Sequence, residues 1–230
     1  MALDRKLQNS IYDYCNNHLA DSQWYLEEFE FIADEQLRGR LVAEFKAIRF
    51  AYKLFEAIEA KEENLLFQVR SQILSYATLY EAIIHYVLYN YYQNTEAFKK
   101  MSMHTVPVKI SVPTQQREKL DKLFHHDGKE LYIFYYKEEA KKEREIRFES
   151  KCNAAKELGL IHGFTNQQGE FVDLPEEIID FYKHRNGIHI IAEQKRGLQY
   201  EIELSKKAYW RMRPFVDQIK QKLREDGRII

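Results

Sequence analysis

The chain has 230 residues, of which 45% are hydrophobic and 14% aromatic, so it can bury a large core and is not a disordered chain. Its eight glycines and four prolines exclude collagen-like and linker-rich proteins and disfavour a turn-dense β-sandwich. A formal net charge of −1 excludes a generally basic surface, so any nucleic-acid site must be a local patch.

The first half of the chain is helical in its apolar spacing. We expect residues 1–60 to form a helical extension, with helices over about 3–20, 22–32 and 35–60, packed on a bundle formed by residues 61–230. The segment 62–93 is apolar almost all round, which is typical of the central helix of a bundle.

An insertion at about 95–147 interrupts this predicted bundle. Residues 106–112 read V-P-V-K-I-S-V, an alternation typical of a short strand with proline at its edge. A short helix to about residue 124 and an aromatic strand over 131–136 follow. The mixed charges of 137–147 favour a solvated helix or loop.

Helices are expected again after the insertion. Residues 148–161 precede a loop over 162–171, and Asp173 with Pro175 marks the start of the next helix. An extended piece is expected near 198–204, and Ser205 is a candidate cap for a last helix to about residue 224, in which Pro214 should introduce a kink. The sequence therefore predicts an all-α, antiparallel helical bundle with a small β-containing insertion.

Cysteine spacing and hydropathy favour a reducing compartment. Cys15 and Cys152 have no metal-like spacing and are interpreted as small core residues. The longest apolar stretch is too short to span a bilayer, and the first residues lack an apolar secretory segment. We expect a cytoplasmic protein without a membrane anchor, a cofactor or a bound metal.

The segment Arg185-Asn186-Gly187-Ile188-His189 carries the most informative polar pattern. On a continuous helix, Arg185 and His189 would share one face, with their Cβ atoms about 6 Å apart. Phosphodiester cleavage requires such groups, because a histidine can move the proton of a ribose 2′-hydroxyl and an arginine can hold the phosphate. The residues alone leave a second interpretation, in which Arg185 forms a salt bridge within the bundle and His189 packs in the core.

The segment from Ala154 to His189, ending in Y-K-H-R-N-G-I-H, resembles the HEPN superfamily of helical domains. The helix at 71–88 is similar to an earlier core helix of that family. The resemblance covers roughly 62–93 and 147–224. It implies a homodimer in which two Arg-His helices form a composite, metal-independent endoribonuclease cleft.

On this resemblance, His189 would be the general acid and base, Arg185 would bind the scissile phosphate, and Asn186 would position phosphate or histidine. Glu81 would orient Arg185 or His189, because a carboxylate on an apolar face is costly unless paired; otherwise it is an exposed residue at the helix edge. Active members usually have four to six residues between the arginine and the histidine, whereas this chain has three.

Basic residues of the C-terminal third are candidates for binding RNA. They are Lys183, His184, Lys206 and Arg211, with Tyr209 and Trp210 available for stacking. A solvated helix face is the alternative interpretation of each.

We therefore expect an RNA-directed, HEPN-like endoribonuclease of a bacterial defence, toxin–antitoxin or stress system. Its expected partners are RNA, a second copy of the chain, and an antitoxin or another protein. The alternative is a catalytically silent HEPN-like dimerisation module that binds a partner protein or a nucleotide.

Overall fold

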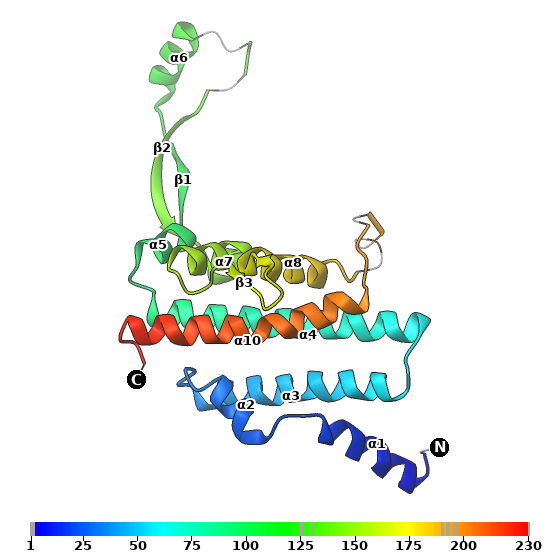
Figure 1. Cartoon of the computed structure of the whole chain (residues 1–230). Coiled ribbons are helices and arrows are strands. Elements are labelled where there is room, and N and C mark those ends of the chain that lie inside the picture. The colour runs from blue at the N-terminus through cyan, green and yellow to red at the C-terminus, as the bar shows by residue number, and fades with distance from the viewer. Residues whose placement is uncertain are drawn as a thin grey trace.

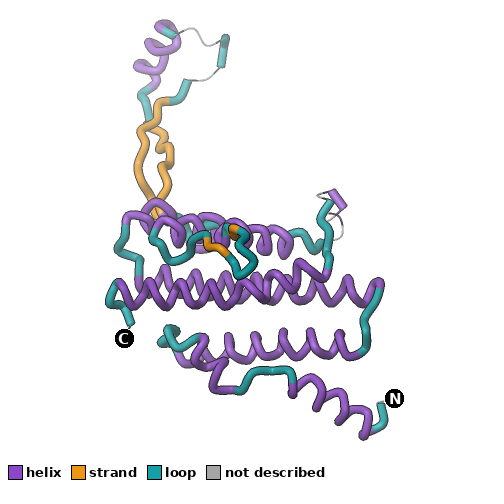
Figure 2. Tube along the Cα trace, in the orientation of Figure 1, coloured by secondary structure: helices purple, strands orange, loops and turns teal. Residues whose placement is uncertain are grey.

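The computed structural model describes residues 3–124, 127–129, 131–189, 191, 194–195 and 197–229. Helices dominate these residues, and two small antiparallel sheets accompany them (Figures 1 and 2). The helices are α1 (Arg5–Asn17), α2 (Ser22–Glu28), α3 (Glu35–Ala57), α4 (Glu62–Tyr91), α5 (Glu96–Ser102), α6 (Thr114–Leu123), α7 (Phe148–Glu157), α8 (Leu174–Asn186) and α10 (Ile202–Glu225), with a 3-10 turn η1 (Glu143–Glu145). The strands are β1 (Met103–Ile110), β2 (Ile133–Ala140), β3 (Phe164–Thr165) and β4 (Phe171–Val172).

Aspartate caps explain where several helices begin. Their carboxylates accept hydrogen bonds from first-turn N–H groups, which have no partner within the helix. The caps are Asp4 for α1, Asp21 for α2, Asp34 for α3 and Asp173 for α8. The sequence prediction of the start of α8 is thereby confirmed.

Helix α4 is the central element of the body. It contacts α3 on one side and α7 and α8 on the other, and α10 runs beside it, so the helices form three layers (Figure 1). Helices α4 and α10 run in the same direction, because Gln72, Tyr80 and Tyr92 bond in that order to Ser205, Ala208 and Asp226. The expectation of a purely antiparallel bundle is therefore wrong for α4 and α10. The long connection between these two helices allows them to run parallel.

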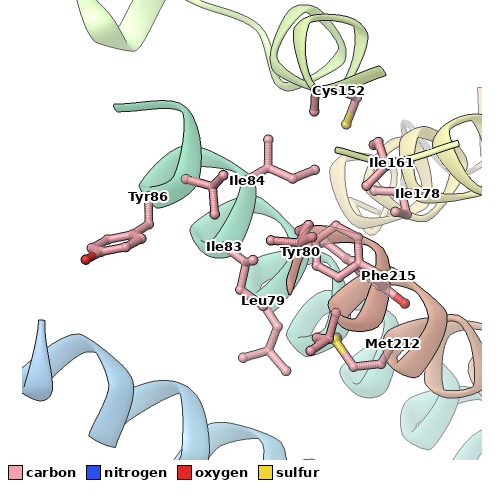
Figure 3. Close-up of a cluster of buried hydrophobic side chains, with 14 of the residues drawn as sticks. Leu79, Tyr80, Ile83, Ile84, Tyr86, Cys152, Ile161, Ile178, Met212 and Phe215 are labelled. Carbon is pink, nitrogen blue, oxygen red and sulfur yellow. The ribbon is translucent and has the colours of Figure 1, made fainter. Parts of the chain in front are cut away.

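The core lies between the middle layer of α4 and α10 and the layer that contains α7 and α8. Figure 3 shows Tyr80 and Ile84 of α4 facing Cys152 of α7, Ile178 of α8 and Phe215 of α10. All of these side chains are buried. Both cysteines are buried and unpaired, which confirms their interpretation as small core residues.

The N-terminal helices cover the other side of α4. Helix α3 packs on α4, and α1 and α2 pack on α3. Phe45 of α3 forms edge-to-face contacts with Tyr25, Phe29 and Tyr76, which join this layer to the centre of the body.

The described residues of 103–140, within the predicted insertion, form an arm that projects from the body, whereas α5 at the start of the insertion packs on α7 and belongs to the body. Strands β1 and β2 pair antiparallel from Met103↔Ala140 to Ile110↔Ile133, and α6 lies at the far end of the arm (Figures 1 and 2). Residues 137–140 belong to β2, so the expected helix or loop in this charge run is wrong there. Pairing with β1 satisfies the backbone groups, and the charged side chains remain in water.

Three further expectations are corrected near the C-terminus. The segment 162–171, expected as a loop, contains part of the β3–β4 hairpin. Helix α10 begins at Ile202, so the expected extended piece is shorter, and Glu201 rather than Ser205 is its cap. The helix continues through Pro214 to Glu225. In the part of the chain that is described, no helix combines the length and the apolar character that crossing a bilayer requires.

Candidate functional site

Helix α8 ends inside the Arg-Asn-x-x-His segment. Gly187 is its C-cap, and its N–H donates to the carbonyl of His184. A β-carbon at Gly187 would meet a methyl group of Leu198, so glycine allows the returning chain to pack against the helix end. The expectation that Arg185 and His189 share one helix face is therefore wrong. His189 is an exposed residue three positions beyond the last helical residue.

Arg185 is held by three neighbours on α4 and α8. One terminal nitrogen donates to the hydroxyl of Tyr182 at 3.1 Å and to Oδ1 of Asn186 at 3.2 Å. The other lies 3.8 Å from the carboxylate of Glu81. The structure thus brings together Arg185, Asn186 and Glu81, as the resemblance implies, but it leaves His189 outside this group.

Tyr182 connects Glu81 to Arg185. Its hydroxyl donates to Glu81 at 3.2 Å, and its ring lies 4.4 Å from that of Phe148. Burial, followed by the negative charge of Glu81, raises the pKa of Tyr182, so its hydroxyl keeps its proton. The side chain of Arg185 remains 30% exposed, so it is oriented by these neighbours and still accessible to an anion.

A pocket of about 620 Å³ opens beside this network. Its walls come from α4, η1, α7 and α8, and Glu81, Tyr182 and Asn186 belong to both the pocket and the surroundings of Arg185, while Lys183 lines the pocket only. This volume is in the usual range for small-molecule sites. The remaining lining residues are Glu143, Arg144, Ile146, Arg147, Phe148, Glu149, Lys151 and Ile179.

Sequence reasoning missed a second polar cluster at this pocket. Nζ of Lys151 lies 3.1 Å from Nδ1 of His85, and Nε2 of His85 lies 3.6 Å from the carboxylate of Glu143. Helix α4, η1 and α7 each supply one of these residues. The available signal was His85, which interrupts the most apolar stretch of the sequence.

Burial and the neighbouring Lys151 together lower the pKa of His85. The carboxylates of Glu143 and Glu81 oppose this shift without cancelling it. His85 is therefore neutral near pH 7, and its Nδ1 accepts a hydrogen bond from the ammonium of Lys151.

The predicted RNA-binding residues occupy separate places. Lys183 lines the pocket. His184 turns back onto α8, where its Nδ1 lies 2.9 Å from the carbonyl of Asp180 and 3.4 Å from its carboxylate. Lys206 pairs with Glu203 on α10 at 3.0 Å.

Arg211 is bound to the body of the protein. Its Nε and Nη2 donate to the carboxylate of Glu177 at 2.5 and 3.3 Å, and its side chain is only 14% exposed. Lys207 lies 3.9 Å from the same carboxylate. The basic residues that begin α10 are thus largely neutralised by acids and line pockets other than that of Arg185.

Within the described ranges, no three His, Cys, Asp or Glu side chains gather in a way that would hold a metal ion. Comparison of the chain with protein-family models, with curated proteins and with solved structures finds no match. The chemistry of this site is consequently argued from its own geometry.

Proposed function

We propose that this protein is an RNA-directed, HEPN-like protein that acts as a metal-independent endoribonuclease. The observation that carries the proposal is the half-buried guanidinium of Arg185, oriented by Glu81, Tyr182 and Asn186 at the edge of a pocket. A cation held in this way is suited to bind a phosphate and to stabilise charge that develops in the transition state. The setting in bacterial defence, toxin–antitoxin or stress responses rests on the resemblance.

The chemistry assigns different roles to two residues. The 2′-oxygen of RNA attacks the phosphorus of the scissile phosphate, which Arg185 binds, and the bond from phosphorus to the 5′-oxygen breaks. The exposed imidazole of His189 takes the proton of the 2′-hydroxyl and returns a proton to the leaving 5′-oxygen. Because α8 does not hold His189 beside Arg185, the two groups meet across a homodimer in which the ends of two α8 helices face each other. The proposed active protein is therefore a dimer.

An RNA cleavage assay without divalent metal tests this proposal. Wild-type protein should cleave mixed RNA in the presence of a chelator, and Arg185→Ala and His189→Ala should each abolish cleavage. Two matched controls, His18→Ala on the N-terminal extension and Arg213→Ala on α10, replace exposed residues and should keep full activity. Uncut RNA with wild type, or equal cleavage by His189→Ala, would refute catalysis at this site.

A second function, dimerisation without catalysis, is favoured by the arm. A two-stranded hairpin is marginally stable by itself, and β2 exposes consecutive large apolar side chains, with Tyr136 72% exposed. Pro107 on β1 has no N–H to donate, so the free edge of β2 is the better edge for pairing. We propose a second copy of the chain as its occupant, paired antiparallel along β2.

Light scattering after size exclusion tests the arm. Wild type should have the mass of a dimer, and the double variant Phe134→Ser, Tyr136→Ser should shift toward a monomer. The matched control Phe171→Ser removes an equally exposed aromatic residue outside the arm and should leave the mass unchanged. An arm variant with the wild-type mass would overturn this pairing.

A further inference from the structure

We propose that the pocket between α4, α7 and α8 binds a phosphate group, with the ammonium of Lys151 as its principal anchor. This inference deepens the proposed function and rests on it, because the pocket shares Glu81 and Asn186 with the site of Arg185. It adds a phosphate-binding residue from α7, a helix that lies outside the Arg-Asn-x-x-His segment.

Lys151 carries a buried positive charge at the wall of the pocket. The residue is only 6% exposed, lines the pocket, and donates to one neutral acceptor, Nδ1 of His85. Among the described residues, no carboxylate forms an ion pair with it. A buried cation without a counter-ion is costly, so its presence at the wall of a pocket indicates that an anion completes the site.

The imidazole of His85 lies beside the ammonium of Lys151. Neutral His85 accepts a hydrogen bond from one of the three N–H donors of the Lys151 ammonium. This bond fixes the position of the ammonium and leaves its charge unneutralised. Glu143 lies on the opposite nitrogen of the imidazole, at 3.6 Å, and so does not serve as the counter-ion of Lys151. The remaining donors of Lys151 are available to a ligand.

The start of α7 lies at the same pocket. Arg147, Phe148 and Glu149 line the pocket, and the N-cap residue Arg147 gives no side-chain acceptor to the first-turn N–H groups. Unpaired N–H groups and the positive end of a ten-residue helix both favour an anion. They lie at the same pocket as the buried ammonium.

The shape and lining of the pocket favour phosphate over a carboxylate. Four basic residues line the pocket, Arg144, Arg147, Lys151 and Lys183, together with three acids. Of these acids, Glu81 is paired with Arg185, Glu143 lies beside His85, and Glu149 is the third. A phosphate offers several oxygens to donors that converge from different directions. A phosphodiester of RNA and the phosphate of a free mononucleotide share this chemistry, and the volume of about 620 Å³ accepts a nucleotide.

Titration of purified protein with defined phosphates tests the inference. The probes are inorganic phosphate, adenosine 5′-monophosphate, adenosine without phosphate, and a short single-stranded RNA, with binding followed by calorimetry and by the shift of the unfolding temperature. Lys151→Met should weaken binding of the phosphate-bearing probes by about tenfold or more, and adenosine should not bind. The matched control Lys156→Met changes an exposed lysine on the same helix and should bind as wild type does.

The probes separate the two sources of phosphate. Lys151-dependent binding of the mononucleotide supports a small-molecule site, and Lys151-dependent binding of RNA alone supports a phosphodiester site. Either result supports a phosphate anchor at Lys151, even if no RNA is cut and the nuclease proposal fails. Equal binding of all probes by wild type and Lys151→Met, or no binding by a folded wild type, would overturn the anchor. Lys151-independent binding of phosphate, together with cleavage that depends on Arg185 and His189, would overturn the anchor while leaving the nuclease proposal intact.

Discussion

The hydroxyl of Tyr80 donates a 2.7 Å hydrogen bond to the backbone carbonyl of Ala208, inside the core between α4 and α10. Both residues are fully buried, and the ring of Tyr80 packs edge-to-face on Phe215 and stacks on Phe181. This contact holds two central helices that run in the same direction. It therefore ties the C-terminal helix to α4, and the stacking of Tyr80 on Phe181 extends this contact to α8, which carries Arg185.

Removal of this hydroxyl should destabilise the protein without changing the packing of the ring. We expect Tyr80→Phe to lower the free energy of unfolding by about 1 kcal/mol, since a buried hydrogen bond is lost. Tyr12→Phe, at an exposed ring of α1, is the matched control and should change it little. Urea unfolding monitored by circular dichroism measures both, and equal effects would contradict a structural role of this bond.

Lys151→Met should raise the free energy of unfolding although it weakens the binding of phosphate. Methionine has a similar length and carries no charge, so the cost of burying an ammonium without a counter-ion disappears. We expect a gain of about 1 kcal/mol, measured as a higher midpoint of urea unfolding in phosphate-free buffer. A clear loss of stability would show that Lys151 is already balanced within the folded chain.

Stability should depend on pH through His85. The groups that face it are Lys151 on α7, Glu143 on η1 and Glu81 on α4, and its pKa in the fold is lowered by burial and by Lys151. Below about pH 6.5, His85 of the unfolded chain becomes protonated, whereas His85 of the folded chain stays neutral to a lower pH because its pKa is lowered. The contribution of neutral His85 is thus present above that pH and is lost as the pH falls.

His85→Gln removes this titration and keeps a hydrogen-bond acceptor for Lys151. As the pH falls from about 8 to about 5, the free energy of unfolding should decrease more for wild type than for His85→Gln. Urea unfolding at several pH values compares the two proteins. Parallel pH profiles would be inconsistent with a lowered pKa of His85.

Arg211 should contribute to stability more than to nucleic-acid binding. Its side chain makes two hydrogen bonds to Glu177 and is largely buried, so Arg211→Gln should cost about 1–3 kcal/mol. Arg213, 66% exposed and 3.6 Å from Asp217, provides the matched control, and Arg213→Gln should cost less than about 1 kcal/mol. Thermal and urea unfolding distinguish the two variants, and similar costs would contradict the structural role.

The local elements could be read from the sequence because their signals are local. Aspartate caps, apolar spacing and Gly159, whose φ is +73°, mark helix boundaries within a few residues of each position. The end of α8 at Gly187 also had a local signal, a glycine within the motif, but the prediction followed the spacing of Arg185 and His189. The strand over residues 137–140 was missed because it depends on pairing with β1, a segment distant in the sequence.

The sequence by itself determined the helical class, the burial of the two cysteines, the arm as an insertion, and Arg185, Asn186 and Glu81 as candidates. The tertiary structure alone decided that His189 leaves the helix, that Arg211 pairs with Glu177, and that Lys151 meets His85. Helix and turn signals depend on residues that are close together in the chain, so a single sequence is enough to show them. Charge balance depends on side chains that distant segments bring within a few ångströms, so it is established only when α4, α7, α8 and α10 pack together.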